Sequence, residues 1–432
     1  MIIHPFLLIK FIEKQEKEEN KKSMATLRKQ VPLLVECRQH AAELRTKRRQ
    51  EFLSLKRVID EPTKPSSQFY SDEQFAQSKS IIYSKNSSEP DLLDALLVLK
   101  SFPPQFEMID ILYLLLNTPS EKLTVATLNV LIQWSVSSAF SKAIFQSHRN
   151  FLNSFQQILE TLGDISKYHV VWLLANLASE PPIFRNMIYE DFVVGMIQLA
   201  KNTTYAPTIR AVVFLFQNLL RGDPPIPESS ALSLSEFQLE MVKTGDPEIY
   251  KDALIGFMLL DTREKTEKVK NYLISKFQFL YENLQITEND ASTRNECEKI
   301  IFYIAGNNLL FTGTEYVEKL EEIGFLNFSK NFVIECGTEG SKSAFCWFLR
   351  NLFVIDDVGM YQLLNSKNLM SQVMLLIQTT KHPPTFLYAS QAFLEFFTYC
   401  GAGEIRRYFD KTLFFLTFKR LLETKEVQYH KN

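Results

Sequence analysis

The sequence predicts an all-α fold made of repeated helical units, and three observations support this prediction. Only 13 of the 432 residues are glycine, about half of the usual share, whereas hairpin-rich β folds need many left-handed turn positions. Apolar segments with helical spacing recur from residue 91 onward, and no alternating strand pattern interrupts them. Short proline-containing breaks, such as residues 102–104 and 222–225, separate these segments.

Charge is distributed unevenly along the chain. The net charge is −2, but residues 1–57 hold 14 Lys and Arg against 7 Asp and Glu, whereas the remainder holds 34 against 43. A basic head and an acidic body can attract each other, or each can meet its own partner. Because phosphate contacts need clustered cations, an acidic body is a poor match for nucleic acid. We therefore expect protein partners and no nucleic acid.

The N-terminal segments precede the helical body. Residues 1–24 start with an apolar run that lacks a basic flank and a cleavage site, so we expect a disordered, dispensable extension. Residues 25–59 are rich in basic residues and predict a charged helix, which is either solvated or docked in an acidic groove. Residues 60–89, with several prolines and serines, have the composition of a linker.

The helical body extends over residues 90–425, before a tail of residues 426–432. None of its apolar runs reaches the length of a membrane span, so we expect no membrane partner. One segment type recurs, in which a large residue is followed four positions later by a second marked residue. The clearest copies are Trp172 with Asn176, Phe214 with Asn218, and Trp347 with Asn351; weaker ones are Val130 with Trp134, Ile255 with Leu259, Glu298 with Phe302, and Phe393 with Phe397.

The spacing of these copies predicts a solenoid. Their first members lie 41 to 49 residues apart by difference of residue number. Armadillo and HEAT repeats have periods of about 40–47 residues, and such arrays form a superhelix with a long concave face.

The marked pairs suggest peptide binding, because residues at i and i+4 share one helix face. An asparagine amide can hold one backbone unit of an extended peptide, and an indole can hold the stem of a lysine. Glu180, one turn beyond Asn176, can add a carboxylate. A single tryptophan is usually core, but three copies in phase favour a ladder that binds a basic peptide. Since an unpaired buried asparagine costs roughly 1–3 kcal/mol, we expect these asparagines to face water or a ligand.

These segments resemble importin-α, the armadillo-repeat adaptor for proteins that carry basic nuclear localisation signals. Residues 171–178 resemble the family's VWALGNIAGD segment, residues 218–227 its NLCRGKPPP turn, and residues 345–352 its ACWTISNI segment. Residues 43–57 resemble the importin-β-binding helix. The resemblance implies a right-handed superhelical armadillo solenoid with an N-terminal basic helix on a flexible linker. It also implies shuttling between cytoplasm and nucleus.

The resemblance further implies which residues bind each partner. The major basic-peptide site would comprise Trp134, Trp172, Asn176, Glu180, Phe214, Asn218 and Asp252, and the minor site Trp347 and Asn351. Importin-β would bind Arg45, Lys47, Arg48, Arg49, Lys56 and Arg57, and an export receptor would be a further partner. The sequence departs from the family at Val130 and Trp134, where Trp and Asn are usual, at Phe214, which replaces a tryptophan, and at Ala344, which replaces an acidic residue. These departures imply weaker or narrower cargo binding.

Two other roles also fit a helical repeat. A scaffold resembling β-catenin would have a basic concave face, whereas Glu180 and Asp252 indicate an acidic one. In a HEAT-type structural subunit, the three asparagines would not align along a groove. The five cysteines and six histidines form no metal-binding, disulfide or catalytic pattern. We therefore expect no enzyme activity, no metal and no cofactor.

Overall fold

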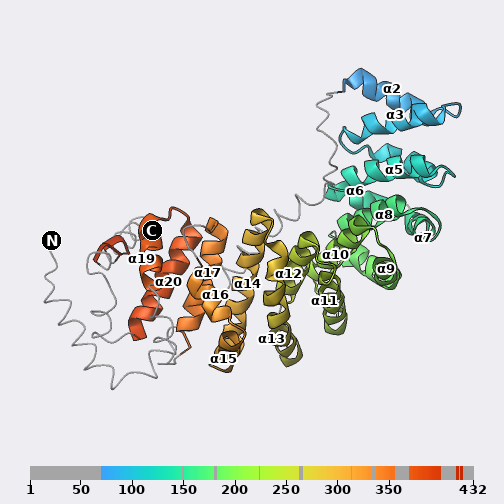
Figure 1. The fold of residues 1–432 in the computed structure, drawn as a ribbon. Helices are drawn as coiled ribbons and strands as arrows, with labels where there is room; N and C mark the ends of the chain where they lie inside the picture. The colour runs from blue at the N-terminus through green and yellow to red at the C-terminus, as the bar shows by residue number, and fades with distance from the viewer. Residues whose placement is uncertain are drawn as a thin grey trace. The chain divides into compact units, whose positions relative to one another are not determined.

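The computed structural model describes residues 70–147, 150–179, 182–222, 224–261, 266–312, 314–332, 337–355, 369–399, 415–417 and 419–421. These residues contain helices and no strand (Figure 1). They fall into two compact units, residues 70–304 and residues 305–421, and helix α14 (Ala291–Thr312) runs across the division. The predicted extension of residues 1–24 and basic helix of residues 25–59 lie outside the described residues.

Each unit is a succession of helices. The 70–304 unit contains α2 (Asp72–Tyr83), α3 (Glu89–Lys100), η1 (Phe106–Met108), α4 (Ile109–Leu116), α5 (Glu121–Trp134), α6 (Ser138–Ser147), α7 (Asn150–Thr161), α8 (Asp164–Ala178), α9 (Pro182–Asn202), α10 (Ala206–Arg221), α11 (Glu228–Val242), α12 (Pro247–Asp261), α13 (Glu267–Glu282) and η2 (Asn283–Thr287). The 305–421 unit contains α15 (Thr314–Glu322), α16 (Phe325–Asn331), α17 (Glu339–Phe353), α19 (Leu369–Thr379) and α20 (Pro383–Tyr399).

Seven of these helices carry the seven predicted sequence copies, namely α5, α8, α10, α12, α14, α17 and α20. Their first residues, 121, 164, 206, 247, 291, 339 and 383, lie 41 to 48 apart by difference. We call them the ladder helices. In the 70–304 unit α5 packs on α8, α8 on α10, and α10 on α12, and in the 305–421 unit α17 packs on α20. The predicted all-α helical repeat is therefore confirmed.

Burial explains why the ladder helices are apolar on nearly every face. Residues 211–220 of α10 are all buried, because α8, α9, α11 and α12 surround this helix. A helix that is apolar all round is stable only in such an interior position. No helix in the described ranges combines the length and apolar character needed to cross a membrane.

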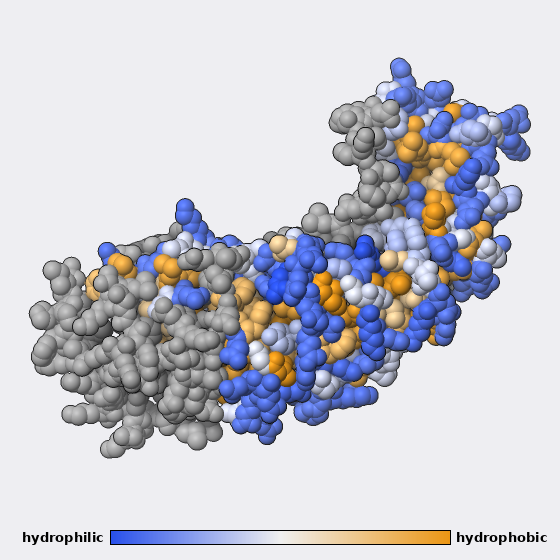
Figure 2. All heavy atoms as spheres, viewed as in Figure 1, coloured by the Kyte–Doolittle hydropathy of each residue, from blue (hydrophilic) through white to orange (hydrophobic). Residues whose placement is uncertain are grey.

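The first helices of the array are less well covered. Leu97, Phe106 and Leu114 are 56%, 50% and 61% exposed, and Figure 2 shows hydrophobic residues at the surface over α2 to α5.

Residues 60–89, predicted to be a linker, contain helix α2 and the start of α3. Ser71 begins α2 with a capping box, in which its hydroxyl accepts from Gln74 N and its own N–H donates to Gln74 Oε1. Ile82 is buried, and the ring of Phe75 lies 4.6 Å from that of Phe102. One of the serines that made this segment resemble a linker, Ser88, is the N-cap of α3.

The turn between α10 and α11 is closed by a buried arginine. Arg185 of α9 is 2% exposed, and its Nη2 donates to the carbonyl oxygen of Pro224. A Cβ on Gly222 would lie 1.4 Å from Arg185 Nη1 and 2.3 Å from its Cζ. Because Arg185 is buried and hydrogen-bonded, it cannot move aside freely, so this position accepts only glycine.

We predict that Gly222→Ala lowers the free energy of unfolding by about 1–3 kcal/mol, the usual range for overpacking a filled site. Urea denaturation followed by circular dichroism measures the change. The matched control is Gly195→Ala, at an exposed position within α9 where an added Cβ meets nothing within 4 Å. There alanine should stabilise the helix by about 0.5–1 kcal/mol. Equal effects at both positions would contradict the role given to Arg185.

Candidate peptide-binding site

An aromatic cluster marks the contact between ladder helices α8 and α10. Trp172 of α8 lies 5.4 Å from Phe214 of α10 and 5.9 Å from Tyr168, measured between ring centroids. Tyr168 in turn lies 6.3 Å from Tyr205, the N-cap residue of α10. Phe214 is buried, whereas the other three are half-buried. The cluster therefore offers a partly exposed indole, held in place by its neighbours, against which an alkyl stem or a cation can pack.

The three marked asparagines lie inside the protein, whereas the sequence predicted that they face water or a ligand. Asn176, Asn218 and Asn351 are 0%, 2% and 1% exposed. Asn218 Nδ2 donates to the carbonyl oxygen of Ala175 at 2.8 Å, and Asn351 Nδ2 donates to that of Gly306 at 2.9 Å.

Asn176 makes the equivalent connection one repeat earlier. Its Nδ2 donates to Ser135 Oγ at 2.9 Å and, at 3.4 Å, to the carbonyl oxygen of Ile132. Each amide thus binds a residue 41 to 45 positions earlier, on or just after the preceding ladder helix. The Nδ2 group of each asparagine is used to join repeats. Because it is hydrogen-bonded, burying it carries no penalty for an unsatisfied donor.

The side-chain oxygens of Asn218 and Asn351 differ in whether they accept a hydrogen bond. Asn218 Oδ1 has no hydrogen-bond partner among the described residues, although it is buried. Asn351 Oδ1 accepts a hydrogen bond from Arg350 Nη1 at 3.0 Å. The first of these acceptors is therefore left unsatisfied by the described residues, whereas the second is already used within the chain.

Other residues of the predicted major site occupy different environments. Trp134 is core: it is 1% exposed, its Nε1 donates to the carbonyl oxygen of Phe102 at 2.9 Å, and its ring meets Phe140 edge-on. Asp252 is buried on α12, 3% exposed. Glu180 and the predicted importin-β-binding residues, Arg45, Lys47, Arg48, Arg49, Lys56 and Arg57, lie outside the described residues.

The predicted minor site is covered by side chains of the chain itself. Trp347 is 2% exposed, and its Nε1 donates to Asn307 Oδ1 at 3.1 Å. Its ring centroid lies 5.2 Å from that of Tyr388 on α20 and 5.3 Å from the guanidinium carbon of Arg350. Sequence reasoning missed Arg350 and, in the other unit, Tyr168, although helical spacing from the neighbouring tryptophan could have indicated both.

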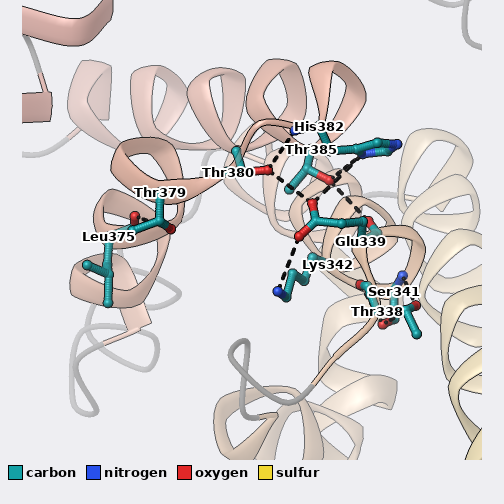
Figure 3. A network of polar contacts seen from close by, with 9 residues as sticks. All are labelled: Thr338, Glu339, Ser341, Lys342, Leu375, Thr379, Thr380, His382 and Thr385. Carbon is teal, nitrogen blue, oxygen red and sulfur yellow. Dashed lines mark hydrogen bonds and ion pairs between the residues drawn. The ribbon is translucent and has the colours of Figure 1, made fainter.

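A polar network joins the starts of α17 and α20 near the minor site (Figure 3). Glu339 Oε2 accepts from Thr380 Oγ1 at 3.0 Å, and the backbone oxygen of Glu339 accepts from Thr385 Oγ1 at 3.0 Å. Burial raises the pKa of Glu339, but hydrogen bonds from Thr380 and Lys342 outweigh it, so the pKa lies below its usual range. The network therefore holds a charged carboxylate in a structural role. Elsewhere in the described ranges, no group of three or more His, Cys, Asp or Glu side chains is arranged to bind a metal.

Comparison with known proteins supports the fold. No protein-family model and no curated protein matches the sequence. The crystal structure of an engineered protein is similar with a TM-score of 0.58 and 14% identity, over 82% of this chain and 88% of that one. Computationally designed armadillo repeat proteins for modular peptide recognition match with a TM-score of 0.42 and 13% identity, over 53% of this chain and 99% of theirs. Only the first score exceeds 0.5, and at that identity the likeness concerns the fold alone. Together with the period, which armadillo and HEAT units share, it supports a helical repeat.

We predict that Asn218→Ala destabilises the protein by about 1–3 kcal/mol, because Ala175 O would lose its donor in a buried position. Chemical denaturation measures this change. Asn153→Ala, at an exposed position within α7, is the control and should leave the free energy of unfolding unchanged or slightly raised. If Asn218→Ala were as stable as the control, the amide would not join the repeats.

Proposed function

We propose that this protein is a nuclear import adaptor, which binds basic nuclear localisation signals on its ladder helices and importin-β through residues 25–59. The observation that carries the proposal is the half-buried indole of Trp172, set between Tyr168 and Phe214 where two repeats meet. An export receptor and movement between cytoplasm and nucleus belong to the same proposal.

In this proposal the stem of a lysine lies on Trp172 and its ammonium group meets a carboxylate, for which Glu180 and Asp252 are the candidates. Asn218 Oδ1 accepts a backbone N–H of the peptide. An unsatisfied buried acceptor costs about 1–3 kcal/mol, which a ligand donor would recover. Many small contacts of this kind, several of them ionic, give binding that weakens as salt rises.

A protein-assembly scaffold without a transport role is the second candidate. The burial of all three asparagines favours it, because their amides are used to hold the repeats together. The two candidates differ in whether Trp172 binds a basic peptide and whether residues 25–59 bind importin-β.

Trp172→Ala should weaken binding of a lysine-rich signal peptide by about tenfold or more, since stacking and cation–π contacts of a partly desolvated indole contribute about 1–2 kcal/mol. Isothermal titration calorimetry measures the affinity at low and high salt. Asn176 is left intact, because its removal would disturb the repeat contact. Tyr83→Ala, which removes a 48% exposed aromatic side chain from α2, is the control and should bind normally. Unchanged affinity for Trp172→Ala would refute peptide binding at this cluster.

The partner of the basic helix is tested separately. Full-length protein should capture importin-β in a pulldown, and a version that lacks residues 1–60 should not. A version in which Arg45, Lys47, Arg48, Arg49, Lys56 and Arg57 are all alanine should also fail, because the lost interaction is electrostatic. Equal capture by all three, or capture by none, would favour the scaffold role.

A further inference from the structure

The two well-preserved tryptophan–asparagine pairs differ in the residue that shares a helix edge with the indole. In the Trp347 pair, the guanidinium of Arg350 lies 5.3 Å from the ring centroid, and its Nη1 donates to Asn351 Oδ1 at 3.0 Å. Arg350 is itself 4% exposed. A single cation of the chain thus lies against the indole, where the proposed function places a lysine stem, and uses the amide oxygen, to which that function assigns a peptide N–H.

The residue before the asparagine sets this difference. In the three clear copies it is Ala175, Gln217 and Arg350, so a cation occurs only in the third. Because this residue lies three positions after the aromatic one, it shares a helix edge with it and can turn over its ring. Neither a methyl group nor a neutral amide can supply a cation to that ring.

We propose that Arg350 is an internal substitute for a cargo lysine, which closes the Trp347–Asn351 site to basic peptides and leaves the Trp172 site as the one that binds them. This inference rests on the proposed function. A second cation would have to displace a buried guanidinium or lie beside it, and like charges placed together in a desolvated contact repel strongly.

Glu395 of α20 supports this assignment. Burial raises the pKa of this carboxyl group, and the positive charge of Arg350 opposes that rise. Glu395 thus interacts electrostatically with Arg350, and a lysine of the peptide would otherwise use this carboxylate. With the arginine removed, the indole and the Asn351 acceptor would lose the cation that now occupies them.

Arg350→Gln tests the proposal, because it reproduces the neutral residue found at Gln217. The probe is pentalysine. Isothermal titration should give one bound peptide for the wild-type protein and two for Arg350→Gln. Arg350→Lys, the matched control, keeps the cation and should still bind one.

The chain has only three tryptophans, Trp134, Trp172 and Trp347, so ¹⁵N-indole spectra report each site directly. In the wild-type protein pentalysine should shift the Trp172 signal and leave that of Trp347 in place, and in Arg350→Gln it should shift both. A shift of Trp347 in the wild-type protein would overturn the proposal without any variant. So would a folded Arg350→Gln protein whose Trp347 signal does not respond.

The same spectra separate this inference from the proposed function. If the Trp172 signal of the wild-type protein does not respond, the assignment of the major site is wrong. A Trp347 signal that then responds in Arg350→Gln alone would still support the role of Arg350. No response of either signal in any of the three proteins would refute both.

Discussion

A side-chain amide that donates to a carbonyl of the preceding repeat is the interaction on which the rest of this structure depends. Consecutive ladder helices are joined in this way by Asn218 to Ala175 and by Asn351 to Gly306. The bond requires a close approach of the two helices. At Gly306 an added Cβ would lie 3.0 Å from Trp347 Cδ1 and 3.1 Å from Phe348 Cα, so glycine permits the distance that the amide needs. Apolar burial drives the stacking of repeats, and the amide fixes its register.

The need for a buried donor between repeats also explains why Trp134 stands where the resemblance leads us to expect a peptide-binding asparagine. Trp134 stands at the position of the asparagine in its repeat, and its Nε1 donates to the carbonyl oxygen of Phe102. On the opposite side of α10, Gln238 Nε2 donates to Val213 O at 3.0 Å, and Gly256 of α12 leaves room for that amide. What recurs is a buried N–H donor directed at a neighbouring helix, and asparagine is one of several residue types that supply it.

The period, the helical class and the helices that carry the marked residues could all be predicted, because they follow from spacing along one chain. Spacing also placed Trp172 and Asn176 on one helix face. Spacing could not show whether that face meets water or a neighbouring repeat, because this depends on residues more than 40 positions away. The linker prediction did not anticipate helix α2 for a different reason: one of the serines that suggested flexibility, Ser88, caps a helix, α3. The three-residue spacing from Trp347 could have indicated Arg350, but its hydrogen bond to Asn351 depends on rotamer choice, which a sequence pattern does not contain.

A structural role for the asparagines does not exclude peptide binding, because a side-chain amide has a nitrogen that donates hydrogen bonds and an oxygen that accepts them. In both Asn218 and Asn351 the nitrogen is used by the preceding repeat, so only the oxygen can differ between sites. At Asn218 it has no partner among the described residues, and at Asn351 Arg350 uses it. Under the proposed function, binding at a copy of the repeat therefore depends less on its aromatic residue and its asparagine, which both copies bury, than on the residue just before the asparagine. Selection for binding can act at that residue without loosening the contact between repeats.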